Sequence, residues 1–260
     1  MNRTLLEYRK VESVAVVRLN RPEALNALNP PLLEALIAAV DEARRDQDVR
    51  CVVVTGNGRA FSAGGDLKAM LAMTREEFRE YILLFQRLST GMRRLAKPCI
   101  AAINGYALAG GFELAIICDI RVAADDAVFG LPDTLVGVSP TSGMTYLLPR
   151  VVGMGWAKYL AFTGETISAA QAERIGLVTR VVPSGELEPA VLDIARSIAR
   201  HPPLALRYIK LGFDLASDVD LQTALTFETD AEVTCWDTDE VRANLKAFAD
   251  RKRAGGSSTT

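Results

Sequence analysis

Apolar residues along the first 180 positions fall into two patterns that alternate with each other. A short β-branched run at residues 14–20 predicts a strand, and the short apolar runs at residues 51–56 and 99–103 predict strands buried on both faces of a sheet. Longer segments with apolar residues every three or four positions predict amphipathic helices over residues 30–45 and 74–95. Asn29 and the two prolines after it mark the start of the first helix. Strands separated by helices predict parallel βα units around one core, and therefore the α/β fold class.

The pattern changes after about Pro183, where four amphipathic segments predict helices with no strand between them. We therefore expect an α/β core over residues 1–199 and a helical region over residues 200–253. The apolar stripes of the helical region must pack on the core or on another subunit. Residues 254–260, AGGSSTT, are small and polar and are expected to form a disordered tail.

The composition limits which binding partners and which cellular compartment we expect for this protein. The 260 residues carry 30 Lys plus Arg and 32 Asp plus Glu, a net charge of -2, so no overall positive field attracts nucleic acid. The four cysteines are far apart and form no CxxC pair, as is typical of buried thiols in a reducing cytoplasm. The single histidine, His201, argues against a histidine-rich metal site and a Ser-His-Asp triad. The sequence predicts neither a membrane span nor a secretory signal.

Two glycine-rich loops with acidic residues are candidates for chemistry: RAFSAGGDLKAM at 59–70 and INGYALAGGFELAIICD at 103–119. The sequence has no P-loop, and GNGRAF lacks the third glycine of a dinucleotide-binding fingerprint. In both loops glycine stands where a predicted strand ends and a helix begins, which leaves backbone N–H groups without intrahelical partners. If the N–H groups of Gly65 and Gly110 face each other, they form a two-donor oxyanion hole. The alternative is that both loops are tight turns and nothing more.

Two carboxylates accompany these loops. Glu113 follows Gly110 by three residues, so its side chain can stand one helical turn from that N–H as an acid or a base. The alternative is a carboxylate that simply stabilises the N-terminus of a helix. Asp133 lies in the apolar segment FGLPDTLVGVSP, where a carboxylate is either a cap with satisfied hydrogen bonds or half of an acid/base pair. The residues alone favour the cap.

Five segments in order carry a resemblance: LNRPEALNALN (19–29), RAFSAGGDLK (59–68), INGYALAGGFELAIICDIRVAADDAVFGLPD (103–133), the helix WAKYLAFTGETISAAQAERIGLVTRVVP (156–183) and AFADRKR (247–253). Together they resemble successive motifs of the crotonase superfamily, whose best-known member is enoyl-CoA hydratase. Five blocks in the family's order are far more specific than one glycine loop. The resemblance implies a ββα-spiral core, a C-terminal helical trimerisation region, and a homotrimer or a homohexamer.

The resemblance also implies roles for individual residues. It places the family's two oxyanion-hole amides on Gly65 and Gly110, and its two catalytic glutamates on Glu113 and Asp133. Asp133 departs from the family because it is one methylene shorter than glutamate, and reacting groups tolerate a misplacement of about 1 Å poorly. Contacts to coenzyme A are implied for the residues of one loop and one terminal cation: Arg59, Ala63, Asp66, Leu67, Lys68 and Lys252.

These roles predict an enoyl-CoA hydratase, which adds water reversibly to a 2-enoyl-CoA thioester through an enolate. The reaction needs no metal and no redox cofactor, and coenzyme A enters only as part of the substrate. Two alternatives stay open. The same pocket would act as a double-bond isomerase, or another acyl-CoA enzyme, if one carboxylate carried the proton; isomerase-like relatives carry a further aspartate where this chain has Thr141. The other alternative is a non-catalytic RNA-binding relative, against which the balanced charge and the retained Glu113 and Gly110 argue.

Overall fold

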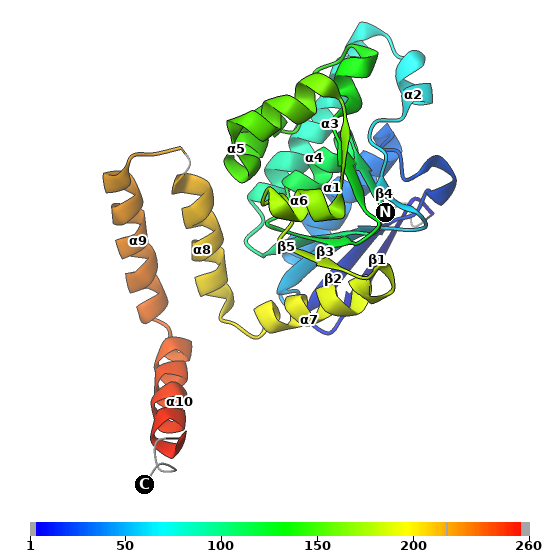
Figure 1. Ribbon diagram of the computed structural model, residues 1–260. Coiled ribbons are helices and arrows are strands. Elements are labelled where there is room, and N and C mark those ends of the chain that lie inside the picture. Colours follow the sequence, from blue (N-terminus) through cyan, green and yellow to red (C-terminus); the bar gives the residue numbers. More distant parts are fainter. Residues whose placement is uncertain (1–3, 217, 256–260) are drawn as a thin grey trace. The chain divides into compact units, whose positions relative to one another are not determined.

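The computed structural model describes residues 4–216 and 218–255 of the chain (Figure 1). The chain divides into two compact units, Met1–Arg200 and His201–Thr260, next to the division expected after residue 199. All residues of the candidate site belong to the first unit.

The first unit is built on a six-stranded sheet, and its fold class is α/β as predicted. The strand order is β1-β2-β3-β5-β7-β10, with all neighbours parallel except the β1–β2 hairpin. The sequence prediction missed β1, whose residues LEYRKV are mostly polar and partly exposed. The strands are β1 Leu6–Val11, β2 Val14–Leu19, β3 Cys51–Gly56, β5 Cys99–Ile103, β7 Ile120–Ala124 and β10 Arg180–Val182.

Both faces of this sheet are buried, which explains the continuous apolar runs of its strands. Side chains alternate along each strand: Val52 and Val54 of β3 enter the main core, whereas Cys51 and Val53 enter a second core on the opposite face. Helices α1 (Pro30–Arg45) and α3 (Arg75–Arg93) contribute to the main core, and α7 (Leu187–Ala199) covers the other face (Figure 1). As predicted, Asn29 caps α1 by accepting a hydrogen bond from the Leu32 N–H.

A second, smaller sheet carries the chain towards the candidate site. Its order is β4-β6-β8-β9, and its strands are β4 Ala60–Ser62, β6 Tyr106–Leu108, β8 Val128–Gly130 and β9 Thr166–Ser168. The strands of the two sheets follow one another as β3–β4, β5–β6 and β7–β8. Helices come after each pair: α2 Leu67–Leu71 and α3, then α4 Gly110–Ile116, then the short η2 Pro132–Val136 and α5 Met144–Thr163. This repeat is the ββα spiral implied by the resemblance.

The segment at 156–183 corrects one prediction, because it is not a single helix. It contains the end of α5, then β9, α6 (Ala169–Arg174) and β10. Gly164 ends α5 in a left-handed conformation with φ 65°, and Ser168 caps α6 through the N–H of Gln171. These two terminal signals divide a segment that the resemblance had presented as one helix.

The second unit contains three helices, α8 Pro203–Ala216, α9 Leu221–Trp236 and α10 Asp239–Gly255. Helices α8 and α9 pack through an edge-to-face contact of Tyr208 with Phe227, whose ring centroids lie 6.1 Å apart. Helix α10 extends into the first two residues of the predicted tail, and residues 256–260 lie outside the described part of the chain. Large apolar side chains remain exposed in all three helices, among them Ile209, Phe213, Leu221, Leu225, Val233, Trp236, Leu245 and Phe248.

Candidate active site

The two glycine-rich loops meet at one edge of the small sheet. Strands β4 and β6 are parallel neighbours, so their carboxyl ends, and the loops that follow them, lie side by side. The contact is between backbones: a Cβ atom on Gly64 would lie 3.0 Å from the Gly110 nitrogen, and one on Gly111 would lie 2.0 Å from the Ser62 carbonyl oxygen. These glycines are therefore needed for close approach, which brings Gly65 and Gly110 to the same place.

The N–H groups of Gly65 and Gly110 have no protein acceptor among the described residues. Gly110 is the first residue of α4, so its N–H lies outside the intrahelical hydrogen-bond pattern. The residue before it, Ala109, has φ 45° and ψ -122°, a conformation that is rare for a residue with a Cβ atom. Gly65 and Gly110 both line the same cavity, so two backbone N–H groups without a protein acceptor among the described residues belong to its wall.

Glu113 lies one helical turn into α4 and is 1% exposed. The N–H of Thr141 donates to Oε1 over 2.6 Å, and the hydroxyl of Ser142 donates to Oε2 over 2.8 Å. Burial raises the pKa of Glu113 from 4.5 to about 7, against the two hydrogen bonds, which lower it, and with a smaller contribution from Asp133, which raises it. A carboxyl with this pKa changes its protonation state at neutral pH, as an acid/base catalyst requires.

Asp133 belongs to η2 and is 8% exposed. Its Oδ2 atom has no hydrogen-bond partner among the described residues, and the N-cap position of η2 is Leu131. Burial raises the pKa of the Asp133 carboxyl. The interpretation of Asp133 as a fully satisfied cap is therefore wrong, and a buried oxygen with no partner has a cost that a site able to bind water or substrate would offset.

A cavity of about 770 Å³ contains both amides and both carboxylates, within the usual size range of ligand pockets. Four side chains of α3 form an apolar wall, and η1 (Pro22–Ala24), α2, α4, η2 and the loops beside them supply the rest. The residues that line it include Arg21, Glu23, Leu25, Ala63, Gly65, Asp66, Leu67, Lys68, Met70, Phe78, Tyr81, Ile82, Phe85, Gly110, Glu113, Asp133, Leu135, Val136, Val138 and Thr141.

The residues expected to contact coenzyme A separate into three groups. Ala63, Asp66, Leu67 and Lys68 line the cavity, and Lys68 is exposed. The Asp66 carboxylate is already used, because it caps α2 through the Ala69 N–H and pairs with Arg21 over 3.0 Å. Arg59 is exposed between β3 and β4 and does not line the cavity, and the side chain of Lys252 lies outside the described residues.

Two sets of cavity residues were not predicted from the sequence: those of residues 21–28, which precede α1, and those of α3. Tyr81 is buried in the cavity wall and donates from its hydroxyl to the Leu28 carbonyl over 2.5 Å, which connects α3 to the segment before α1. The available signal was the apolar stripe of the helix predicted over 74–95, which is as consistent with a core as with a pocket. Nothing in the local sequence predicted that the Ser142 hydroxyl donates a hydrogen bond to Glu113.

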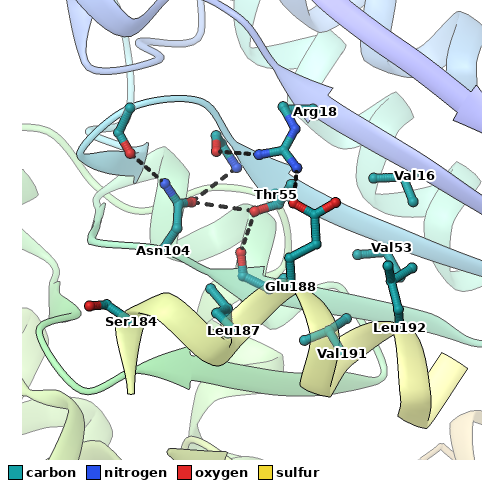
Figure 2. Close-up of a pocket in the computed structure, with 13 residues that line it drawn as sticks. Val16, Arg18, Val53, Thr55, Asn104, Ser184, Leu187, Glu188, Val191 and Leu192 are labelled. Carbon is teal, nitrogen blue, oxygen red and sulfur yellow. Dashed lines mark hydrogen bonds and ion pairs between the residues drawn. The ribbon is translucent and has the colours of Figure 1, made fainter. Parts of the chain in front are cut away.

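A second cavity, of about 200 Å³, lies between α7 and the sheet (Figure 2). Its polar side chains bond to each other or to backbone: Arg18 donates to Glu188 over 2.7 Å, and the Asn104 side chain links the Thr55 hydroxyl to the Gly58 carbonyl. This arrangement fixes the ends of β2, β3 and β5 and leaves these groups with structural partners.

Within residues 4–216 and 218–255, no group of three or more His, Cys, Asp or Glu side chains is placed to hold a metal ion. Each helix in the same part of the chain is too short or too polar to cross a membrane.

Comparison with known proteins shows the family of the chain. A sequence model described as enoyl-CoA hydratase/isomerase matches residues 9–255. The chain is 40% identical over 257 residues to the short-chain-enoyl-CoA hydratase of Clostridium acetobutylicum, covering 98% of each protein. It is 40% identical to the crotonyl-CoA hydratase of Syntrophomonas wolfei, covering 94% of this chain and 95% of the relative. The crystal structure of enoyl-CoA hydratase from Bacillus anthracis superposes with a TM-score of 0.92 at 37% identity, covering 95% of this chain and 96% of that one. The chain therefore belongs to the enoyl-CoA hydratase/isomerase family.

Proposed function

We propose that this protein hydrates 2-enoyl-CoA thioesters. The observation that carries the proposal is the pair of buried carboxyls, Glu113 and Asp133, in one cavity with the two N–H groups of Gly65 and Gly110. The names of the relatives, short-chain-enoyl-CoA hydratase and crotonyl-CoA hydratase, support the same substrate class.

In the proposed reaction the thioester carbonyl oxygen accepts hydrogen bonds from the Gly65 and Gly110 N–H groups. Glu113 takes a proton from water as the water oxygen bonds to C3, and the electrons of the C2–C3 double bond move to the thioester oxygen. The resulting enolate is stabilised by the two N–H groups. It returns its electrons to C2, which receives a proton from Asp133, so the net change is the addition of one water molecule.

The surroundings of the two carboxyls support this division of roles. The Thr141 N–H and the Ser142 hydroxyl are placed to stabilise an ionised Glu113, as a base requires. The Asp133 Oδ2 has no donor among the described residues, so a proton on this carboxyl loses no hydrogen bond. Two carboxyls in one cavity favour hydration over isomerisation, which needs a single carboxylate to carry a proton between carbons.

The proposal extends to cofactor, partners and compartment. Hydration transfers protons without a net oxidation or reduction of the substrate, so it needs neither a redox group nor a metal. Coenzyme A enters as part of the substrate. We expect Lys68 at the cavity rim to attract its phosphates. The exposed apolar residues of the second unit support a homotrimer or homohexamer. The near-neutral net charge creates no overall positive potential that would attract nucleic acid, and the free cysteines are typical of a cytoplasmic protein.

The test is to incubate the protein with a panel of 2-enoyl-CoA and 3-enoyl-CoA thioesters. Hydration removes the conjugated enoyl-thioester absorbance and adds 18 mass units, whereas isomerisation of a 3-enoyl-CoA creates that absorbance at unchanged mass. Glu113→Gln and Asp133→Asn are each expected to lower kcat by roughly 10²- to 10⁴-fold. Glu23→Gln is the matched control, because Glu23 lines the same cavity but is exposed.

Two results would contradict the proposal. Hydration at nearly the wild-type rate by Asp133→Asn would make Asp133 a structural residue and exclude the paired-acid mechanism. A shifted double bond with no gain in mass would replace hydration by isomerisation.

A further inference from the structure

Ser142 occupies a position where the backbone favours glycine. It has φ 56°, and the next residue, Gly143, also has a left-handed conformation with φ 79°. A residue with a Cβ atom costs roughly 1 kcal/mol in this region, whereas glycine adopts it freely. A serine retained in such a conformation, and only 2% exposed, suggests that its side chain has a function.

The hydroxyl of Ser142 is directed to one acceptor. It donates to Oε2 of Glu113 over 2.8 Å, while the neighbouring Thr141 N–H donates to Oε1 over 2.6 Å. Each carboxylate oxygen thus accepts one hydrogen bond from the loop before α5, and each keeps a lone pair for a further donor. With both oxygens held, the carboxylate plane of Glu113 is fixed.

Helix α3 anchors the loop that provides these donors. The hydroxyl of Ser89, itself 7% exposed, donates to the Ser142 carbonyl over 2.8 Å, and the Gln86 side chain donates to the Thr141 hydroxyl over 2.9 Å. The anchor, the loop and the carboxylate come from three separate segments of the chain, so the arrangement depends on tertiary packing and not on a local turn.

We infer that Ser142 is a positioning residue for the acid/base chemistry: its hydroxyl, fixed through Ser89, orients the Glu113 carboxylate and stabilises its negative charge. This inference rests on the proposed function, in which Glu113 is the base. Two titratable groups are coupled to Glu113: the charge of Asp133 on η2 raises the pKa of Glu113, and the charge of Glu113 in turn raises the pKa of Tyr81 on α3. Neither donates a hydrogen bond to it in the structure, so Ser142 and the Thr141 N–H are its stabilising partners.

The experiment measures kcat/KM for crotonyl-CoA as a function of pH in wild type, Ser142→Ala and Ser142→Gly. The wild-type profile should rise near pH 7, where Glu113 ionises. Loss of a hydrogen bond to the charged form should move this rise upward by about one pH unit in both variants, and lower kcat at neutral pH by roughly 10-fold, with little change in KM. Ser142→Gly separates the hydroxyl from the backbone, because it removes the strained Cβ and should melt no lower than wild type.

Thr145→Val is the matched control. It removes a hydroxyl three residues further along the chain, on an exposed residue of α5 that does not line the cavity, so its profile should keep the wild-type midpoint. A double-mutant cycle between Ser142→Gly and Glu113→Gln, followed by urea unfolding at pH 8, gives a second readout that does not depend on turnover. We expect a non-additive interaction between the two sites, because the hydroxyl bonds directly to the carboxylate.

Unchanged pH midpoints in both Ser142 variants, together with additive unfolding energies in the cycle, would overturn the inference and leave Ser142 as a packing residue. Failure of the proposed function is a different result: the wild-type protein would then shift the double bond of a 3-enoyl-CoA with no gain in mass, whatever the unfolding cycle between Ser142 and Glu113 shows.

Discussion

At the scale of single residues, the burial that gives Glu113 a pKa suited to acid/base catalysis also lowers the stability of the folded protein. A carboxyl that ionises near pH 4.5 in the unfolded chain ionises near pH 7 in the folded one, because burial removes the water that would solvate its charge. Folding therefore takes up a proton between these two pH values. The penalty is absent below the lower pKa and fully present above the higher one.

Glu113→Gln is accordingly expected to stabilise the protein at pH 8 while it abolishes hydration. The relief is at most roughly 3 kcal/mol, reduced by the weaker hydrogen bonds that a neutral amide accepts. At pH 4 the difference between variant and wild type should nearly vanish, because the wild-type carboxyl is protonated in both the folded and the unfolded chain there. Urea unfolding at the two pH values measures this difference in unfolding free energy. A variant less stable than wild type at pH 8 would show that the hydrogen bonds from Thr141 and Ser142 stabilise the charged carboxylate by more than burial destabilises it.

The resemblance implies contacts to coenzyme A for both Lys68 and Arg59, and the structure distinguishes the two cations. Lys68 lines the cavity, whereas Arg59 does not. We expect Lys68→Ala to raise KM several-fold, with an effect that shrinks as salt increases, and Arg59→Ala to have a smaller effect on KM. Steady-state kinetics at two ionic strengths measures both, and a larger effect at Arg59 would contradict this assignment.

At the scale of elements, α4 is fixed at both ends, and this fixes the site. At its N-terminal end the backbone lies against the end of β4, where Gly111 meets the Ser62 carbonyl. At its C-terminal end the buried Arg121 of β7 donates to the carbonyls of Cys118 over 2.8 Å and Leu177 over 2.7 Å. The helix that carries Gly110 and Glu113 therefore has little freedom to shift relative to Gly65.

Gly111→Ala should separate β4 from α4. A Cβ atom at this position would lie 2.0 Å from the Ser62 carbonyl oxygen, so backbone must move. We expect a loss of more than about 3 kcal/mol in unfolding free energy. The control is Gly155→Ala in α5, where a Cβ atom meets nothing within 4 Å and alanine should stabilise by up to about 1 kcal/mol. Denaturant unfolding compares the two, and equal stabilities would refute the close-contact argument.

How far the sequence predicts this fold depends on how each element is buried. Strands β2, β3 and β5 were predictable because burial on both faces makes them continuous apolar runs. The strands of the small sheet have only three residues each, too few to show a period, and β1 is polar on its exposed side. In the site, the spacing of Gly110 and Glu113 is local to one helix and was readable, whereas Ser142 and Tyr81 reach the cavity only through tertiary packing.

At the scale of the whole molecule, the second unit exposes several large apolar side chains. Phe213 is 78% exposed, Leu221 74% and Phe248 68% in the isolated chain. Scattered apolar residues are normal on a surface, but several large ones along three consecutive helices are typical of a surface that binds a partner. Copies of the same chain are the simplest occupants, since most soluble oligomers are closed and symmetric.

Light scattering should therefore give a mass of three or six times the 28.2 kDa chain at micromolar concentration. Phe213→Asp and Phe248→Asp, alone and together, should shift this mass towards the single chain, because a charge placed in an apolar interface must be desolvated without a partner. Leu71→Asp is the matched control: it places the same charge on an exposed leucine of α2 in the first unit and should leave the mass unchanged. A wild-type mass of 28.2 kDa across this concentration range would contradict the oligomer and would leave the exposed side chains of the second unit for a different partner.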